Sequence, residues 1–120
     1  MPTYEQRDIV IVEFPYSTRT SIKKRPAIII SSDWFNTKRD EVIVLAITSN
    51  NNEQRDKFPI QPRFTNECRL NQDSSVKTGT FLTIHKQFII KKLGKLDLGE
   101  FKKLVKYYMD VLGYPEKVKI

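Results

Sequence analysis

Short apolar runs separated by polar stretches dominate the first half of the chain. Three runs rich in isoleucine and valine occur at Asp8–Phe14, Ala27–Ser31 and Glu41–Thr48. Successive β-branched residues over this length are typical of strands buried on both faces. Pro26 precedes the second run, at the start of a strand, where a missing N–H is tolerated. The pattern therefore predicts three buried strands, with the polar segment Ser17–Lys24 as a loop between the first two.

The middle of the chain is less regular. Asn51–Asp73 is polar, and its portion Phe58–Pro62, which contains two prolines, predicts an edge strand within a long connection. Ser75–Ile84 predicts two short strands bent at Gly79. Lys86–Lys92 predicts one or two helical turns.

The clearest element is a C-terminal helix. Its apolar positions recur at helical spacing: Leu98, Phe101, Leu104, Val105, Tyr108 and Leu112. The opposite face carries Lys102, Lys103 and Lys106. Asp97 and Glu100 suit the first turn as a capping pair, and Gly113 suits the end. A run of strands followed by one helix predicts a single α+β domain over residues 1–120, mainly β, with a barrel-like sheet and a C-terminal helix.

The net charge favours one class of function. Twenty-one Lys and Arg against fourteen acidic residues give 120 residues a charge of +7 and a pI near 9.6. A small, strongly basic domain is typical of nucleic-acid-binding proteins. Surface lysines that only maintain solubility are the alternative.

Several function classes are disfavoured. Cys68 is the only cysteine, so an internal disulfide is excluded and a reducing compartment is expected. No apolar run has the length of a membrane helix, and the N-terminus lacks the apolar stretch of a signal peptide, so we expect a cytoplasmic protein. One histidine and one cysteine cannot build a zinc cluster of His and Cys ligands, and glycine-rich phosphate motifs are absent. Any chemistry is therefore expected to need neither metal nor cofactor.

Several motifs, in order and spacing, carry a family resemblance. Asp8–Val12, Lys24–Ile29 and Ala46–Ser49 resemble the G-D-I-V, K-R-P-A and I-T-S signatures of MazF/PemK toxins. Thr83–Lys86 and Gly94–Leu96 resemble that family's R-T-I-D-K and G-K-L segments. The resemblance implies an SH3-like barrel of the CcdB/MazF/PemK type. It also implies a homodimer that cleaves single-stranded RNA (mRNA) at short motifs, in a type II toxin–antitoxin system whose antitoxin covers the active groove.

The resemblance assigns catalysis to Arg25 and Thr48. Metal-free RNA cleavage needs a deprotonated 2′-hydroxyl, a stabilised phosphorane and a protonated 5′-oxygen. The planar guanidinium of Arg25 suits phosphate oxygens, and the hydroxyl of Thr48 suits the phosphate or the 2′-hydroxyl. Alternatively, Arg25 is a solvated charge and Thr48 caps a turn.

Further residues are candidates for contact with RNA. The polar ones are Lys24, Ser49, Arg19, Lys77 and Lys86. Stacking on bases is expected of aromatic side chains exposed on the surface, for which the candidates are Trp34, Phe35 and Tyr16. These aromatic side chains could equally pack in the core or at a dimer contact.

Three positions depart from the family pattern. Arg7 stands in place of a glycine, and Leu82 and His85 stand in place of an arginine and an aspartate. A second cation for the phosphate would then come from Arg7 or Arg19, or would be missing. Histidine is a common acid–base catalyst, which makes His85 a candidate, but a single histidine is more typical of a structural role.

Two other functions remain compatible with the same fold. One is a CcdB-like toxin that binds a protein target such as gyrase without cutting RNA. The other is a non-catalytic nucleic-acid-binding barrel. The CcdB-like toxin would not need Arg25 and Thr48 together, and in the barrel the active site would have decayed.

Overall fold

The computed structural model describes residues 3–14, 23–48, 57–60, 65–66 and 74–113. The elements in these ranges are, in chain order, β1 (Asp8–Phe14), β2 (Lys23–Ile29), α1 (Asp33–Lys38), β3 (Glu41–Thr48), β4 (Lys57–Ile60), β5 (Thr65–Asn66), β6 (Ser74–His85), the 3-10 turn η2 (Lys86–Phe88), β7 (Ile89–Leu96) and α2 (Leu98–Leu112).

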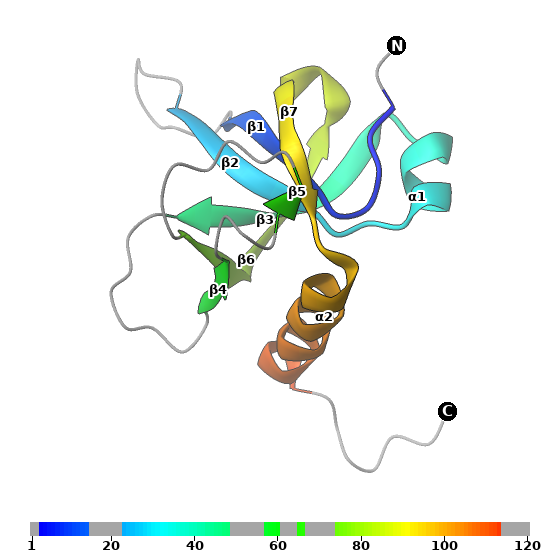
Figure 1. The fold of residues 1–120 in the computed structure, drawn as a ribbon. Coiled ribbons are helices and arrows are strands. Elements are labelled where there is room, and N and C mark those ends of the chain that lie inside the picture. The colour runs from blue at the N-terminus through cyan, green and yellow to red at the C-terminus, as the bar shows by residue number, and fades with distance from the viewer. Residues whose placement is uncertain (1–2, 15–22, 49–56, 61–64, 67–73, 114–120) are drawn as a thin grey trace.

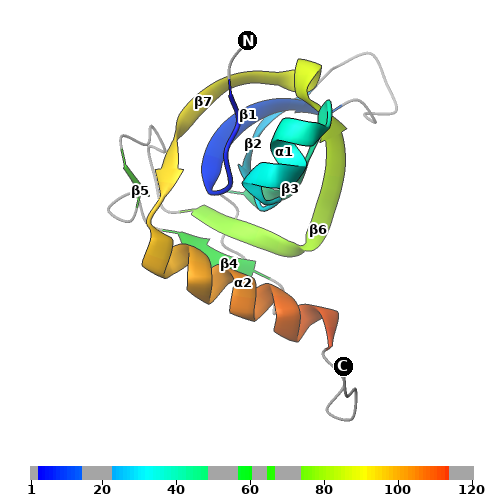
Figure 2. The ribbon, with the colours of Figure 1, turned by 90° about the vertical axis from the view of Figure 1, so that its right-hand side faces the viewer.

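The described strands form one antiparallel sheet in the order β4-β6-β3-β2-β1-β7-β5. The sheet curls strongly, so that β6 and β7 wrap around β1, β2 and β3 (Figures 1 and 2). The expected mainly β architecture with a C-terminal helix is confirmed.

Both faces of the central strands are buried, as the apolar runs predicted. An inner cluster fills the concave side of the sheet and consists of Tyr4, Val10, Val12, Ala27, Ile29, Val42, Val44, Ala46, Ile84 and Ile89. An outer cluster lies between the convex side and α2 and consists of Ile9, Ile28, Leu45, Ile47, Ile60, Val76, Leu93, Leu96, Phe101 and Leu104. Consecutive residues of each central strand therefore contribute to opposite clusters.

The strands β1 and β3 have the predicted bounds, whereas β2 begins earlier than expected. Lys23 and Lys24, predicted to lie in a loop, extend β2 and pair with Phe14 and Glu13 of β1. Backbone pairing with the already formed β1 satisfies their polar groups, and this overrides the polar composition of the segment. The edge strand predicted near Phe58 is confirmed as β4.

Between Ser75 and Lys92, one prediction was wrong and the other holds only over its first residues. β6 is one long strand rather than two, although its pairing with β3 shifts between Leu45 and Ile47, close to the predicted bend. The segment after it is not helical beyond the short turn η2, because Ile89–Leu96 forms strand β7. Two register shifts against β1 interrupt the alternation of buried and exposed residues along β7. Its buried residues are therefore spaced like those on one face of a helix.

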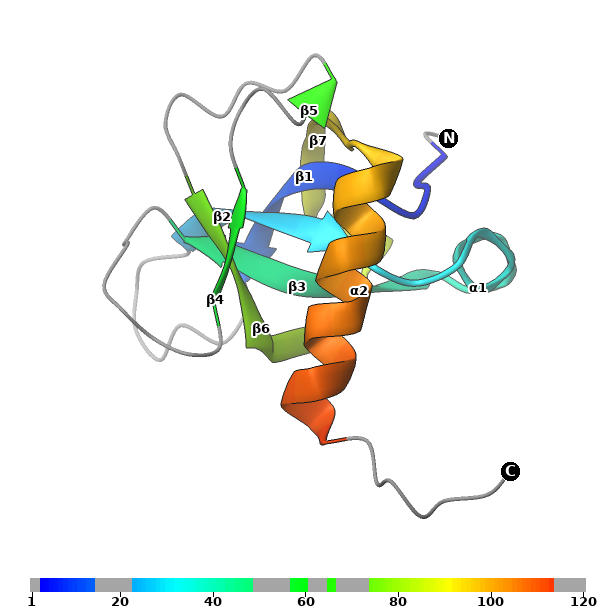
Figure 3. The same ribbon diagram turned by 60° about the horizontal axis from the view of Figure 1, so that its bottom comes forward.

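Helix α2 crosses the convex face of the sheet (Figure 3). Phe101 and Leu104 are buried, but Leu98, Val105 and Leu112 of the predicted apolar stripe are exposed. Gly113 ends the helix in the left-handed conformation, as predicted, whereas Asp97 makes no capping hydrogen bond with its side chain. Neither of the two described α-helices has the length and apolarity of a membrane span.

The short helix α1 was not predicted, because six residues are too few for a periodic pattern. Its local signals were nonetheless present in the sequence. The hydroxyl of Ser32 accepts a hydrogen bond from the N–H of Phe35 at the N-cap, Asp33 lies in the first turn and Lys38 in the last. These are ordinary start and stop signals of a helix.

Arg7 adopts a left-handed conformation, with φ of 80°. This explains why a glycine suits the position, since the left-handed region strains any residue with a Cβ. Three hydrogen bonds hold Arg7 in place. Its N–H donates to Ile29 O at 2.9 Å, its carbonyl accepts from the N–H of Leu96 at 3.0 Å, and its Nη1 donates to Leu96 O at 3.0 Å.

Replacement of Arg7 should separate backbone strain from the side-chain hydrogen bond. Arg7→Ala and Arg7→Gly both remove the guanidinium, but only the alanine keeps the strained conformation. We expect Arg7→Gly to be more stable than Arg7→Ala by about 1 kcal/mol in urea unfolding. Gly113→Ala, at φ of 77° with open space around an added Cβ, should cost a similar amount. Equal stability of the two Arg7 variants would contradict this account.

Candidate functional site

Arg25 and Thr48 occupy facing positions on neighbouring strands. Ala27 of β2 pairs with Ala46 of β3, and the antiparallel register, continued by two residues, sets Arg25 opposite Thr48. On the other side, Arg25 pairs directly with Val12 of β1. Residues that face each other across antiparallel strands lie on the same side of the sheet. The two side chains that the sequence assigned to catalysis therefore belong to one row.

This row lies on the concave face, at one end of the sheet. Val12, Ala27 and Ala46 all belong to the inner cluster, and the alternation of each strand puts Arg25 and Thr48 on the same face. Arg25 is exposed and Thr48 is half-buried. Polar side chains thus follow the hydrophobic ones at the point where β2 begins and β3 ends.

Strand β6 adds two polar residues to this face. Ser75 pairs with Thr48, and Val76 next to it belongs to the outer cluster, so Ser75 and Lys77 face the concave side. Ser75 is buried and Lys77 is half-buried. The sequence indicated Lys77 but not Ser75. Its position was not predictable, because only the register of strands far apart in sequence brings Ser75 beside Thr48.

The rim of the concave face thus carries two cations and two hydroxyl groups, from Arg25, Lys77, Thr48 and Ser75; we call these four residues the rim group. An arginine fork and a lysine ammonium next to hydroxyl donors suit a phosphate group. Carboxylates are absent from the described residues of this row, which runs through Val12, Arg25, Thr48, Ser75 and Pro59. The local charge is therefore positive.

Two further candidates from sequence are not placed with the rim group. Lys24 is exposed and pairs with Glu13, one residue away from Arg25, and therefore points to the convex side. Lys86 lies beyond the other end of β3, about 24 Å from Thr48 along the strand. Its Nζ donates to the carbonyl of Asn36, which anchors α1. Arg19, Ser49 and Tyr16 lie outside the described residues.

His85 also lies at the end of β3 away from Thr48, where it pairs with Glu41. The side chain is exposed, and its Nδ1 accepts a hydrogen bond from the N–H of Gln87 at 3.0 Å, which caps η2. This contact is structural, as the sequence favoured.

Arg7 does not supply a cation to the rim group, and Leu82 has no charge to supply. The guanidinium of Arg7 is engaged at Leu96 O, beyond the opposite end of β1 from Val12. Leu82 is half-buried and packs against the inner cluster. Hydrophobic packing accounts for the leucine at this position.

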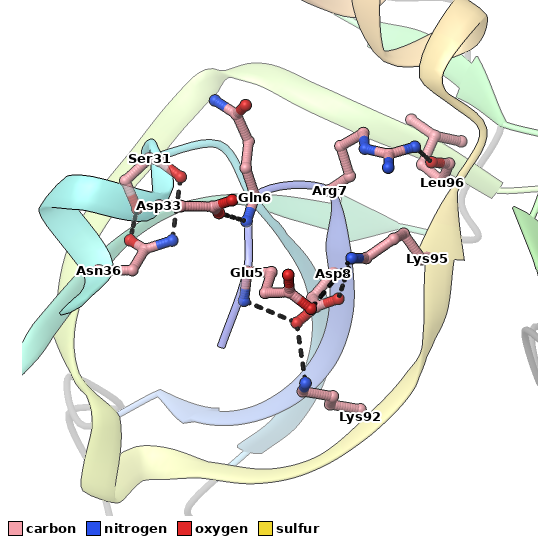
Figure 4. Close-up of polar contacts among 10 residues, drawn as sticks. All are labelled: Glu5, Gln6, Arg7, Asp8, Ser31, Asp33, Asn36, Lys92, Lys95 and Leu96. Atoms are coloured by element: carbon pink, nitrogen blue, oxygen red, sulfur yellow. Dashed lines mark hydrogen bonds and ion pairs between the residues drawn. The ribbon is translucent and has the colours of Figure 1, made fainter. Parts of the chain in front are cut away.

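A polar network closes the end of the sheet that lies away from Arg25 (Figure 4). The buried carboxylate of Asp8 forms ion pairs with Lys92 at 3.2 Å and Lys95 at 3.8 Å, and accepts a hydrogen bond from the N–H of Glu5 at 2.8 Å. Burial raises the pKa of the nearby Tyr4 hydroxyl, and the charge of Asp8 raises it further. Because each charge is paired locally, the network is structural.

Helix α1 joins this network and exposes an aromatic side chain. Asp33 accepts a hydrogen bond from the N–H of Gln6 at 2.9 Å, and the buried amide of Asn36 donates to Ser31 O at 3.0 Å (Figure 4). Trp34 is 69% exposed and therefore not part of the core. The alternatives of base stacking and of a protein contact both stay open for this tryptophan.

Within the described ranges, no three His, Cys, Asp or Glu side chains converge on a common point.

Known proteins resemble the chain in sequence and in fold. A family model described as PemK-like, MazF-like toxin of type II toxin–antitoxin systems matches residues 5–111. No curated protein sequence is similar enough to count as a relative.

Solved structures share the fold at low sequence identity. Toxin MazF-mt6 of Mycobacterium tuberculosis is 20% identical, with 91% of this chain and 99% of that chain covered and a TM-score of 0.74. A mycobacterial endoribonuclease in complex with its cognate antitoxin is 16% identical, with 96% and 98% covered and a TM-score of 0.72. MazE–MazF of Deinococcus radiodurans is 13% identical, with 95% and 100% covered and a TM-score of 0.75. The expected fold of MazF toxins is thereby confirmed.

Proposed function

Because the chain belongs to the family of PemK-like, MazF-like toxins of type II toxin–antitoxin systems, we propose that it is a metal-independent endoribonuclease that cuts single-stranded RNA in the cytoplasm. The observation that carries the proposal is the register of β2 and β3, which, continued from Ala27 and Ala46, sets Arg25 and Thr48 on one face of the sheet. Lys77 and Ser75 extend the same polar surface.

The reaction is an attack by the RNA on its own backbone. The 2′-oxygen forms a bond to phosphorus and loses its proton to water, while the bond from phosphorus to the 5′-oxygen breaks and that oxygen takes a proton from water. The products are a 2′,3′-cyclic phosphate and a 5′-hydroxyl. DNA lacks the 2′-hydroxyl and is not a substrate.

Arg25 stabilises the charge that develops on the phosphorane. An arginine guanidinium is a fixed cation that offers two parallel donors to two phosphate oxygens. It is for the same reason a poor general base. Thr48, opposite Arg25, donates its hydroxyl to the phosphate or aligns the 2′-hydroxyl. Electrostatic stabilisation is commonly the largest contribution to such a reaction.

An antitoxin is the second proposed partner. Two of the structural neighbours are complexes, one with a cognate antitoxin and one of MazE with MazF. A chain with a charge of +7 attracts an acidic polypeptide as it attracts RNA. An antitoxin tail that covers the rim group would neutralise Arg25 and Lys77 and exclude the substrate.

A homodimer is proposed as the active form. Leu98, Val105, Met109 and Leu112 share one side of α2 and remain exposed. A contiguous apolar stripe of this kind is typical of a protein interface. A second copy of the chain would bury it.

Substitution of Arg25 tests the proposed chemistry. Arg25→Ala should lower the rate of RNA cleavage by about a hundredfold or more, because a lost phosphorane donor has no replacement. Arg25→Lys should recover only part of the rate, since an ammonium cannot bind two oxygens as a fork. Thr48→Ala should be less severe, because water replaces a hydroxyl in part. Full activity in Arg25→Ala, together with inactivity in His85→Ala, would contradict the assignment.

The oligomeric state should depend on α2. We expect the wild-type chain to sediment at about twice its mass of 14.1 kDa at micromolar concentration. Met109→Glu should shift the population towards monomer, since it places a charge in the apolar stripe. Lys103→Glu, on the polar side of the same helix, is the matched control and should remain dimeric. A wild-type chain that sediments only as a monomer would refute the homodimer.

A further inference from the structure

Leu82 carries no charge, so a second cation for the phosphorane has to come from another residue. The phosphorane carries more negative charge than the phosphate, and a single arginine leaves part of it uncompensated. We propose that Lys77 supplies the second cation and contacts the scissile phosphate together with Arg25. This inference rests on the proposed ribonuclease function and assigns a catalytic residue within it.

The register of β3 and β6 places Lys77 within reach. Thr48 pairs with Ser75, so Lys77, two residues further on, is the diagonal neighbour of Thr48 on the same face. Diagonal neighbours of this kind lie about 7–8 Å apart, which a long side chain spans. Arg25 lies on the other side of Thr48. A phosphate bound at Thr48 is therefore flanked by a cation from each neighbouring strand.

The residues next to this position leave space for the lysine. Ala27 and Ala46, the facing pair in the next row inward, have the shortest side chains of the inner cluster. The stem of Lys77 is half-buried, and a partly buried ammonium is less screened by water than a fully exposed one. Both features strengthen its interaction with a phosphate on the concave face.

Several other described cations near the sheet are engaged elsewhere or face away, although Lys57 pairs with Lys77 and Lys23 lies two residues from Arg25 on β2. Arg7 donates to Leu96 O, Lys86 donates to Asn36 O, and Lys24 is on the convex side. Lys92 and Lys95 pair with Asp8. Lys77, in contrast, makes no ion pair with any residue that the structure describes.

The test measures single-turnover cleavage in EDTA at saturating single-stranded RNA, at a site mapped with the wild-type chain. Lys77→Gln keeps the length of the side chain and removes the charge. We expect its rate constant to fall by about a hundredfold, and Lys77→Arg to restore most of the rate. Lys91→Gln, at an exposed position of β7, removes the same charge and should cleave as the wild type does.

Binding separates a catalytic cation from an ordinary RNA contact. RNA with a single 2′-deoxy substitution at the cleaved site is the uncleavable probe. Lys77→Gln should bind it only several-fold more weakly, with a salt slope reduced by about one. Urea unfolding checks that each variant is folded. A wild-type rate in Lys77→Gln, or a loss confined to binding, would overturn the inference. No cleavage by the wild-type chain would overturn the proposed function itself.

Discussion

The burial of the curled sheet on both faces is the constraint on which the rest of the structure depends. Because β1, β2 and β3 contribute to the inner and the outer cluster on alternate residues, their middle portions have no room for polar chemistry. In these three strands, polar side chains are confined to the ends. One end is closed by paired charges around Asp8 and by α1 (Figure 4). The other end carries Arg25, Thr48, Ser75 and Lys77, and there positive charge lies on the concave face without a carboxylate in the same described row.

Local sequence patterns predicted the elements whose burial is periodic, and failed where backbone irregularities change the period. β1, β3 and α2 follow unbroken patterns and were placed correctly. β7 was mistaken for a helical segment because two register shifts space its buried residues like those of a helix. For the candidate site, the sequence assigned catalysis only to residues that lie within family motifs. Family motifs indicated Arg25 and Thr48 as candidates, but their position beside Ser75 depends on strand register, which no local pattern contains.

The departures from the family pattern have physical explanations. Arg7 tolerates a left-handed backbone because its guanidinium and both backbone groups are hydrogen-bonded to β2 and β7. Leu82 packs against the inner cluster, where a charged side chain would need a polar partner. The arginine lost there removes a cation from the family pattern, and Lys77 from the other half of β6 faces the same concave side as Arg25. With Arg25 and Lys77, the rim group still has two cations, the second of them from a position other than that of Leu82.

The central claim is that the 2′-hydroxyl of RNA attacks the phosphate at the rim group without a metal ion. It is tested most directly by the ends that the purified chain leaves on single-stranded RNA in EDTA. The account predicts a 2′,3′-cyclic phosphate and a 5′-hydroxyl, and no cut at that site when its nucleotide is 2′-deoxy. RNA that stays intact in EDTA, or a deoxy-substituted site that is still cut, would contradict it.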